Sequence, residues 1–408
     1  MDKLSVKDLP LQGKKVLVRV DFNVPMDAQG HITDPSRILA SLPTIQYLID
    51  QKASIILMSH LGRPKGKIHP ELSMKPCAKY LSERLKMPIA MASDCIGKDV
   101  EFLANGLKPG QILMLENLRF YEGEEKPKDH PEFVRSLAQL AEYYINDAFG
   151  TAHRFHASTA AITEYFPEKA AAGFLLEKEI QFLGDALQRP EHPFLAIIGG
   201  AKISSKMGTL KALLERVDTL LIGGAMAHTF FKAQGIEIGS SLYEEDQLEQ
   251  ARLLLEESHK KDKRLILPTD LLIANAIQKN AETKVISLRE GIPQGWMGVD
   301  IGPQTIQAFI EQMQQAKTLF WNGPLGIFEI DPFSKGTETI AKALAKCSSA
   351  LTIVGGGDSL AAIHKAGMEN QITHLSTGGG ASLEYIEFGM LPGIEALSPR
   401  SNQAKITL

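Results

Sequence analysis

Short apolar runs alternate along the chain with polar or glycine-rich breaks and with longer stretches of helical period. In the first part these runs lie at residues 16–20, 55–58, 112–115 and 143–145. In the second part they lie at residues 194–198, 219–222, 265–267, 318–321 and 351–354, with a shorter run at 374–376. Such alternation is typical of βα units, in which helices cover both faces of a parallel sheet.

Between the runs, apolar residues recur on one side of expected helices. Three stripes have this spacing: Ile38, Leu42, Ile45 and Ile49; Phe133, Leu137, Leu140, Ala141 and Tyr144; and Leu210, Leu213, Leu214 and Val217. This periodicity predicts amphipathic helices that bury one face against a sheet. We therefore expect an α/β protein with two doubly wound, Rossmann-like parallel-sheet domains.

The length of 408 residues supports more than one domain. We place an N-terminal domain at residues 1–172 and a C-terminal domain at residues 191–391. The charged stretch at residues 173–190 ends at a proline and predicts a connecting helix that acts as a hinge. The last residues, SPRSNQAKITL, have no strong pattern and on this ground alone would be loosely ordered.

Composition narrows the classes of partner. A net charge of −4 provides no overall basic field, which disfavours nucleic acids and anionic membranes. The three cysteines are far apart and form no CxxC motif, which favours a reducing compartment. There is no leader-like apolar segment and no run of about 18 apolar residues. We expect a cytoplasmic, monomeric protein that binds small molecules.

Polar residues follow the strands of the first part. In an open parallel sheet ligands bind beyond the carboxyl ends of the strands, where the loops converge. The residues at this edge, together with one loop arginine, are Asp21, Asn23, Arg37, His60, Arg63, Arg119, His153 and Arg154. A single arginine is most often solvated surface charge, and a single histidine is most often structural. Repeated guanidinium groups at strand ends instead favour a site for phosphate or carboxylate.

The strands of the second part end in glycine. The segments are GGAKISSK (199–206), GGAM (223–226), WNGPLGIFE (321–329), GGGDS (355–359) and TGGGAS (377–382). Glycine lets phosphate oxygens approach backbone amides at helix N-termini, so several such loops favour a polyphosphate nucleotide. No GxxxxGK[ST] motif is present, and no GxGxxG motif follows a strand, which disfavours a Walker loop and a dinucleotide fingerprint.

Individual residues in these loops allow two interpretations. Lys202 and Lys206 lie one helical turn apart and address neighbouring phosphates or simply face solvent. Asp358 is a helix cap or a Mg²⁺ ligand, and Glu329 is surface charge or an acceptor for a sugar hydroxyl. Sequence alone does not choose between these roles.

Taken together, the segments resemble the phosphoglycerate kinase family over nearly the whole chain. VLVRVDFNVP, SRI, HLGRP, ENLRF, NDAFGTAHR, GGAKISSK, WNGPLGIFE, GGGDS and STGGGASLE follow that family's order and spacing. The resemblance implies reversible phosphoryl transfer between 1,3-bisphosphoglycerate and Mg·ADP, giving 3-phosphoglycerate and Mg·ATP in glycolysis. It also implies that the tail at residues 392–408 packs back onto the N-terminal domain.

The resemblance further implies a role for each matching residue. The phosphoglycerate site would comprise Asp21, Asn23, Arg37, His60, Arg63, Arg119 and Arg154. The transferred phosphoryl group would lie among Arg37, Lys202 and the amides of Gly378, Gly379 and Gly380. The nucleotide would contact Gly200, Lys206, Gly224, Gly298, Asn322, Glu329, Gly355, Gly356, Gly357, Asp358 and Ser359, with Asp358 holding Mg²⁺.

Two positions depart from the family pattern, Phe155 beside Arg154 and Ser205 before Lys206. Two other functions remain open: a hydroxyl-directed small-molecule kinase that uses Asp21 as its base, and a binding protein without catalysis. An acyl phosphate needs no general base, because the attacking phosphate oxygen is already an anion. Alignment and neutralisation of charge are then sufficient.

Overall fold

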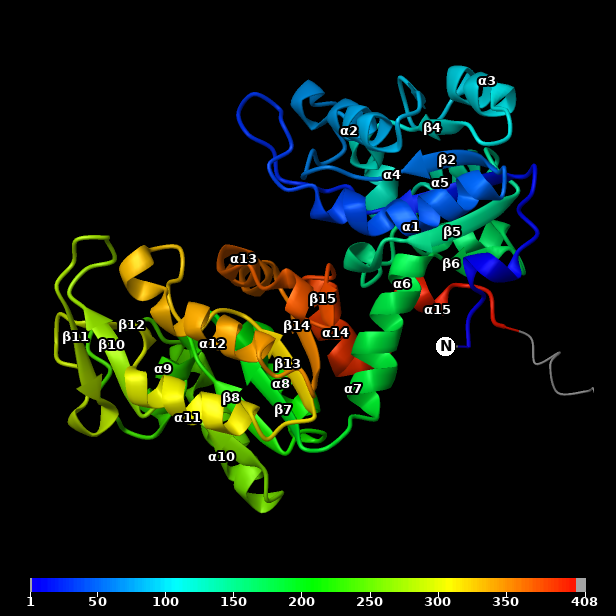
Figure 1. Ribbon diagram of the computed structural model, residues 1–408. Coiled ribbons are helices and arrows are strands. Elements are labelled where there is room, and N and C mark those ends of the chain that lie inside the picture. The colour runs from blue at the N-terminus through cyan, green and yellow to red at the C-terminus, as the bar shows by residue number, and fades with distance from the viewer. Residues whose placement is uncertain (1, 401–408) are drawn as a thin grey trace, which may run out of the picture. The chain divides into compact units, whose positions relative to one another are not determined.

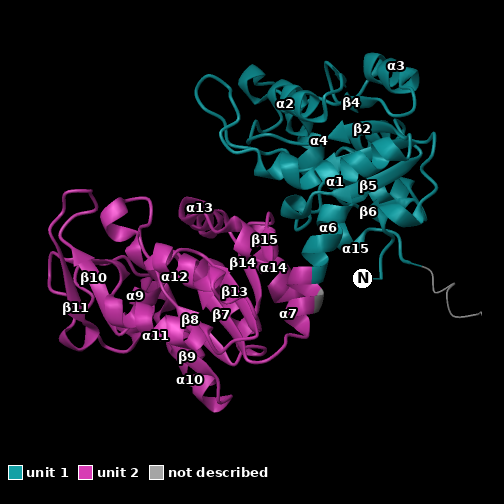
Figure 2. Cartoon of the chain, viewed as in Figure 1, with its two compact units in different colours: residues 1–181, 390–408 teal, residues 182–389 magenta. Residues whose placement is uncertain are grey.

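The computed structural model describes residues 2–400 and forms two compact units (Figures 1 and 2). The first unit runs to Gln181 and resumes at Met390, and the second comprises Phe182–Gly389. Each unit contains a six-stranded sheet, so the predicted α/β class with two parallel-sheet domains is confirmed. No helix in the described residues combines the length and the apolar character needed to cross a membrane.

The sheet of the first unit has the order β3-β4-β2-β1-β5-β6, and all its strands are parallel. Its strands are β1 (Lys15–Val20), β2 (Ser54–Met58), β3 (Ile89–Met91), β4 (Ile112–Met114), β5 (Tyr143–Asp147) and β6 (Ala170–Ala172). The helices are α1 (Ser36–Asp50), α2 (Lys75–Leu85), α3 (Lys98–Gly106), α4 (Glu122–Glu125), α5 (Pro131–Ala138), α6 (Phe174–Glu179) and α15 (Pro392–Glu395).

The central strand β1 has two different faces. Val16, Val18 and Val20 belong to an apolar cluster that includes buried side chains of α1 and α2. Because side chains alternate along a strand, Arg19 lies on the opposite face. It is fully buried there, although it lies within an apolar run. A guanidinium in such a place requires partners, and these form part of the site described below.

The parallel sheet of the second unit has the order β15-β14-β13-β7-β8-β9. Its strands are β7 (Phe194–Ile198), β8 (Thr219–Ile222), β9 (Arg264–Ile266), β13 (Thr318–Asn322), β14 (Leu351–Gly355) and β15 (His374–Ser376). The helices are α7 (Ala186–Gln188), α8 (Met207–Leu214), α9 (Met226–Ala233), α10 (Leu248–Lys260), α11 (Pro303–Met313), α12 (Lys335–Ala345), α13 (Gly357–Ala366) and α14 (Gly380–Phe388).

The second unit also has a three-stranded antiparallel sheet, which the apolar runs do not predict. It has the order β11-β10-β12 and consists of β10 (Asp270–Ala274), β11 (Thr283–Ser287) and β12 (Met297–Ile301). Its sequence signal is weak because β11 is mostly exposed and β12 contains the buried Asp300. This small sheet supplies one wall of the cavity described below.

The segment between the two parallel sheets is helical but not a uniform α-helix. A π-helical turn at Ile180–Asp185 separates α6 from α7. A π-helical turn has i→i+5 hydrogen bonds and often marks a functional position. The proposed domain limits at 172 and 191 stay predictions.

The end of the described chain contacts the first unit. The N–H of Gly393 donates to the carbonyl oxygen of Ala152 at 2.8 Å, and Asn146 Nδ2 donates to the carbonyl oxygen of Gly393 at 3.1 Å. Arg400 forms an ion pair with Asp8 at 2.7 Å. The part of the predicted tail packing that concerns residues 401–408 lies outside the described residues.

Candidate functional site

An ion pair lies at the carboxyl end of β1. Asp21 follows this strand and is 5% exposed, and its Oδ2 accepts a hydrogen bond from Arg37 Nη1 at 2.9 Å. Arg37 lies in the first turn of α1, and its side chain is 34% exposed. The carboxylate thus holds one guanidinium at the rim while leaving part of it accessible to an anion.

The loop after β2 is held from two sides. Asn23 Oδ1 accepts from the N–H of Gly62 at 2.9 Å, and Arg119 Nη1 donates to the carbonyl oxygen of Gly62 at 2.9 Å. Gly62 has a φ of +63°, a conformation in which glycine is favoured. Asn117 fixes the preceding residue, because it both accepts from and donates to the backbone of Leu61. The sequence therefore brings Asn23 and Arg119 to one loop.

Two predicted arginines, Arg63 and Arg154, point to solvent. Both are exposed, and within residues 2–400 neither guanidinium has a recorded hydrogen bond or ion pair. Arg154 still lies close enough to influence two neighbouring histidines. Burial, followed by the charge of Arg154, lowers the pKa of His153 to about 4. Burial, followed by Arg119, lowers the pKa of His156 to about 3. These imidazoles are therefore neutral near pH 7.

His60 lies beneath this rim and is 2% exposed. Its Nδ1 is 3.0 Å from Nη2 of Arg19. Burial and then the charges of Arg19 and Arg119 hold the pKa of His60 well below its usual value of 6.5. His60 is therefore an uncharged member of a site that is otherwise rich in arginine.

Sequence reasoning missed the group that supports His60. Arg19 Nε donates to Ser158 Oγ at 2.7 Å, and Ser158 Oγ donates to Glu124 Oε1 at 2.6 Å. Glu124 is fully buried, and its Oε1 lies 3.9 Å from Arg19 Nη2. Burial raises the pKa of Glu124, while Arg19 and Ser158 oppose the rise. The available signal was the lone arginine inside an apolar strand, which requires a counter-charge.

Lys206 marks the corresponding edge of the second unit. Its Nζ donates to the carbonyl oxygen of Gly199 at 2.6 Å and to Asn322 Oδ1 at 2.8 Å. Burial lowers the pKa of Lys206 to about 8, and the nearby Asp358 carboxylate opposes the shift. The predicted Lys206 and Asn322 are therefore in direct contact at the ends of β7 and β13.

The glycines here allow close approach between backbone segments. A Cβ on Gly224, whose φ is +70°, would lie 2.6 Å from the backbone nitrogen of Gly200. Gly356 has a φ of +92° and faces the Asn322 side chain. Ser359 Oγ accepts from the N–H of Gly323 at 2.6 Å, which ties the start of α13 to the loop after β13. These glycines are required by the fold itself, in addition to any role with a ligand.

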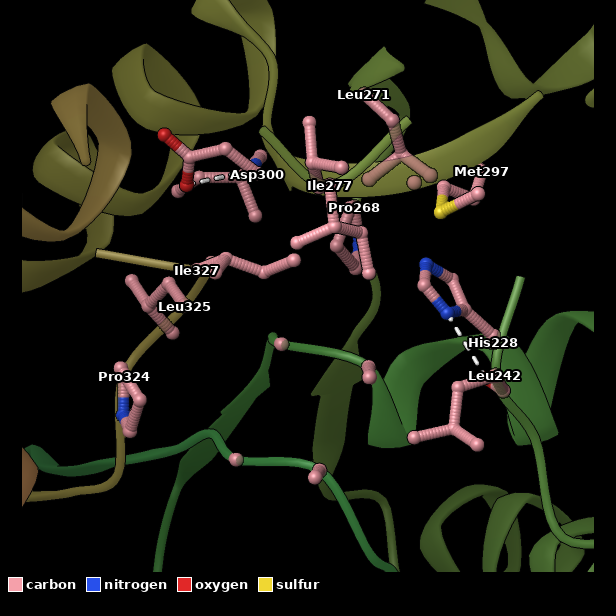
Figure 3. Close-up of a pocket in the computed structure, with 18 of the residues that line it drawn as sticks. His228, Leu242, Pro268, Leu271, Ile277, Met297, Asp300, Pro324, Leu325 and Ile327 are labelled. Atoms are coloured by element: carbon pink, nitrogen blue, oxygen red, sulfur yellow. Dashed lines mark hydrogen bonds between the residues drawn. The ribbon is translucent and has the colours of Figure 1, made fainter. Parts of the chain in front are cut away.

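A cavity of about 270 Å³ opens beside these loops (Figure 3). Five of the predicted nucleotide residues line it: Gly200, Gly224, Gly298, Glu329 and Asp358. The labelled side chains around it are mostly apolar, as Figure 3 shows for Leu271, Ile277 and Met297. An apolar cavity with a few polar groups at its edge suits a flat heterocycle that carries a charged substituent.

His228 is a polar residue in this wall that sequence reasoning missed. It is 3% exposed, and its Nδ1 lies 3.1 Å from the carbonyl oxygen of Leu242 (Figure 3). Burial lowers its pKa to about 4, and the bond to Leu242 opposes the shift. A neutral imidazole whose Nδ1 donates to a carbonyl has Nε2 as an acceptor. No sequence signal distinguished His228 from a core residue of α9.

Lys202 and the triple glycine do not line the cavity. Lys202 is exposed, and its carbonyl oxygen accepts from Ser205 Oγ at 3.0 Å, which gives the unusual Ser205 a local role. Gly379 has a φ of +54° and precedes α14, which begins at Gly380. A Cβ on Gly379 or Gly380 would meet no atom within 4 Å. There is therefore open space beside this helix N-terminus.

Comparisons with known proteins agree with one another. A family model described as phosphoglycerate kinase matches residues 6–388. The phosphoglycerate kinases of Prosthecochloris aestuarii and Moorella thermoacetica are 53% and 52% identical over 400 residues, which is 98% of this chain and 100% of each relative.

Two solved structures, both titled as phosphoglycerate kinases, are similar over 97% of this chain and 98% of theirs. The protein from Coxiella burnetii has a TM-score of 0.85 at 41% identity, and that from Pyrococcus horikoshii has a TM-score of 0.84 at 32% identity. Because the family model and these relatives span nearly its whole length, the chain belongs to the phosphoglycerate kinase family.

Proposed function

We propose that the protein transfers a phosphoryl group reversibly between 1,3-bisphosphoglycerate and ADP, giving 3-phosphoglycerate and ATP. The observation that carries this proposal is that a chain of this family has two separate candidate sites, one suited to each substrate. One is an arginine-rich rim around Asp21 and His60, and the other is an apolar cavity with Lys206 near its edge. Neither the cytoplasmic location nor the monomeric state is required for the reaction, and both stay predictions.

On the first unit, we assign the substrate's carboxyl and hydroxyl end to Asp21 and Asn23. The non-transferring phosphate would contact His60, Arg63, Arg119 and Arg154. The exposed guanidinium groups of Arg63 and Arg154 suit this role, because they have no recorded partner in residues 2–400 to give up. A bidentate guanidinium also matches the geometry of phosphate oxygens.

On the second unit, we assign the base to the apolar cavity, the ribose to Glu329, and the phosphates to Lys206 and the loops at Gly355–Ser359. Asp358 would hold Mg²⁺, which proteins often bind through one carboxylate together with substrate phosphates. The residue fits this role because its carboxylate is exposed and lines the cavity near Lys206. When bound, the ion would neutralise phosphate charge.

The chemistry assigned to the chain is alignment and electrostatic stabilisation. An oxygen of the ADP β-phosphate bonds to phosphorus, and the carboxylate leaves with the electron pair of the broken P–O bond. No proton needs to be moved. Arg37, Lys202 and the amides of Gly378–Gly380 would stabilise the equatorial oxygens, and closure of the two units through residues 173–190 would exclude water.

The alternative of a hydroxyl-directed kinase would need Asp21 as a free base. Both of its carboxylate oxygens are engaged, Oδ2 by Arg37 and Oδ1 by the backbone N–H of Asn23. A substrate hydroxyl would have to displace one of these hydrogen bonds to reach a carboxylate oxygen. This arrangement favours the acyl-phosphate reaction.

A coupled assay tests the proposal directly. ATP should be consumed only when 3-phosphoglycerate is present, and glycerol or sugars in its place should give no turnover. Lys211→Ala should behave as the wild type, because Lys211 is an exposed residue of α8 that contacts Gln250. Turnover with a hydroxyl acceptor, or none with 3-phosphoglycerate, would contradict the proposal.

A further inference from the structure

The contact between Arg19 and His60 determines which nitrogen of His60 carries a proton. Arg19 Nη2 lies 3.0 Å from His60 Nδ1, and both side chains are almost completely buried. A guanidinium has five N–H donors and no acceptor. The Nδ1 atom must therefore accept, so it carries no proton. In a neutral imidazole the single proton is then on Nε2.

Arg19 cannot easily turn away from this contact. Its Nε donates to Ser158 Oγ at 2.7 Å, and its Nη1 donates to the carbonyl oxygen of Val20. Ser158 in turn donates to Glu124, whose Oε2 also accepts the N–H of Ser158 at 3.0 Å. Because a guanidinium only donates hydrogen bonds and a carboxylate only accepts them, the direction of each bond in this network is fixed.

The surroundings of His60 oppose a second proton. After burial, the largest influences on His60 are the positive charges of Arg19, Arg119 and Arg37, while the nearby carboxylates of Glu124 and Asp21 are paired with Arg19 and Arg37. Burial and these guanidinium groups hold the pKa of His60 well below 6.5. Within the described residues, Nε2 has no recorded hydrogen bond. It is thus a donor with no recorded partner in a site built for anions.

We propose that Arg19 is a positioning residue that holds His60 as the neutral Nε2–H tautomer, so that His60 gives the substrate's phosphate a hydrogen bond without a charge. This inference rests on the proposed function, because it takes phosphoglycerate as the anion. The rim would then contain two kinds of group: the arginines attract the phosphate through their charge, whereas the Nε2–H of His60 orients it through a hydrogen bond. Arg19 itself is fully buried and acts through His60.

The tautomer can be read directly in the wild-type protein. Two-bond nitrogen–proton couplings of ¹⁵N-labelled histidine distinguish a protonated Nε2 from a protonated Nδ1, and the spectrum of His60→Gln assigns the signal. We expect a single Nε2–H form without ligand, and a shift of this signal when 3-phosphoglycerate is added. A protonated Nδ1, or an imidazolium at pH 7, would overturn the inference.

The role of Arg19 is tested in a double variant that removes both members of the buried Arg19–Glu124 ion pair. Arg19→Met alone would leave Glu124 unpaired and could prevent folding, so Arg19→Met is combined with Glu124→Gln. In the folded double variant we expect the Nδ1–H form of His60 to appear and KM for 3-phosphoglycerate to rise more than kcat falls. An unchanged single Nε2–H tautomer in this variant decides against Arg19 as the holder. If the double variant does not fold, Ser158→Ala, which removes one of the bonds that fix Arg19, takes its place: a mixture of tautomers supports the role of Arg19, and a single Nε2–H form decides against it.

Kinetics at different ionic strengths separate a donor from a cation. His60→Leu removes the donor, so KM should rise about tenfold or more, while His60→Gln, which keeps an N–H, should stay closer to the wild type. Salt weakens charge interactions, so Arg63→Gln should flatten the dependence of KM on salt. His60→Leu should leave that dependence unchanged. If it flattens the dependence as Arg63→Gln does, His60 acts as a cation and the inference fails.

Failure of the proposed function would look different. If 3-phosphoglycerate supports no turnover, the enzymatic assignment falls, but the spectrum of the ligand-free protein still shows whether Arg19 holds the tautomer. If turnover is normal and the His60 signal does not respond to 3-phosphoglycerate, the enzymatic assignment stands and the role of His60 is overturned.

Discussion

The two candidate rims lie at the same edge of similar sheets but are built from different chemistry. In the first unit, side chains hold side chains: Asp21 holds Arg37, and Glu124 with Ser158 holds Arg19. In the second unit, glycine backbone is packed against glycine backbone, and Lys206 bonds to the ends of two strands. The two candidate rims therefore offer two different chemistries that suit an anion, guanidinium groups in the first unit and backbone amides in the second.

Two buried histidines show the same contrast at atomic scale. Nδ1 of His60 meets a guanidinium and must accept, whereas Nδ1 of His228 meets the carbonyl oxygen of Leu242 and must donate. Both imidazoles are neutral because burial lowers their pKa. One consequently offers an N–H on its free side and the other offers a lone pair. Burial thus keeps each imidazole neutral, and the hydrogen-bond partner of its Nδ1 determines which ring nitrogen carries the proton.

The largest effect should come from breaking the buried ion pair of the first unit. Glu124→Gln leaves Arg19 without a counter-charge and should lower the free energy of unfolding by about 3–5 kcal/mol. Urea unfolding measures this change. Glu122→Gln, at an exposed position of the same short helix, should change it by less than about 0.5 kcal/mol. Equal stability of the two variants would mean that the buried pair contributes nothing.

The next effect concerns the two cations assigned to the transferred group. Lys202→Ala should lower kcat about 10²- to 10³-fold with an unchanged melting temperature, because Lys202 is exposed. Arg37→Ala should lower kcat similarly but also cost about 1–3 kcal/mol of stability, since it strands the Asp21 carboxylate. Kinetics and thermal melts on both variants test this difference. Near-normal turnover in either variant would remove that residue from the transition state.

Two glycine substitutions separate a packing role from a ligand role. Gly224→Ala should destabilise the second unit, because its Cβ would overlap the backbone of Gly200. Gly380→Ala should leave stability unchanged or slightly higher, because its φ is not positive and the space beside it is open. If the amides of Gly378–Gly380 stabilise the transferred phosphoryl group, the kcat of Gly380→Ala should still fall. Full activity of Gly380→Ala would show that the space is not used.

Gly380 is a sharper position for this test than Gly379. The positive φ of Gly379 would strain any side chain, and a β-branched valine most of all, so loss of activity there would be mixed with loss of stability.

The smallest effect is a difference in pH dependence between the two substrates. Burial lowers the pKa of Lys206 to about 8, so its charge is present below pH 8 and is lost as the pH rises through that value. KM for ATP should therefore rise about three- to tenfold by pH 9. KM for 3-phosphoglycerate should stay nearly constant, because guanidinium groups do not titrate in this range. A Lys206→Arg variant should lose the ATP effect, and a parallel rise of both KM values would contradict this account.

Strong periodic signals in the sequence were sufficient for the main architecture. The apolar runs of β1, β2, β7 and β13 predicted the parallel sheets, and the glycines and arginines after them indicated the two rims. Shorter or more exposed strands, such as β3, β6 and β11, gave no such signal, because edge strands and small sheets bury too little apolar surface to impose a pattern.

The supporting residues were harder to predict than the rim itself. Arg19 was hidden within an apolar run, and its partners Glu124 and Ser158 lie more than 100 residues further along the chain. Only the folded topology brings such distant residues together. Phe155 was noted as a departure, and the structure places it at the surface, with Lys128 Nζ 5.8 Å from its ring centroid.

The Arg19 network also has a consequence for synthesis on the ribosome. The partners of Arg19 are His60, Glu124 and Ser158. A nascent chain that does not yet reach Ser158 therefore contains a guanidinium without its full set of partners. Domains tend to fold as units while translation continues. The first sheet should therefore stay open to water around Arg19 until Ser158 has left the exit tunnel.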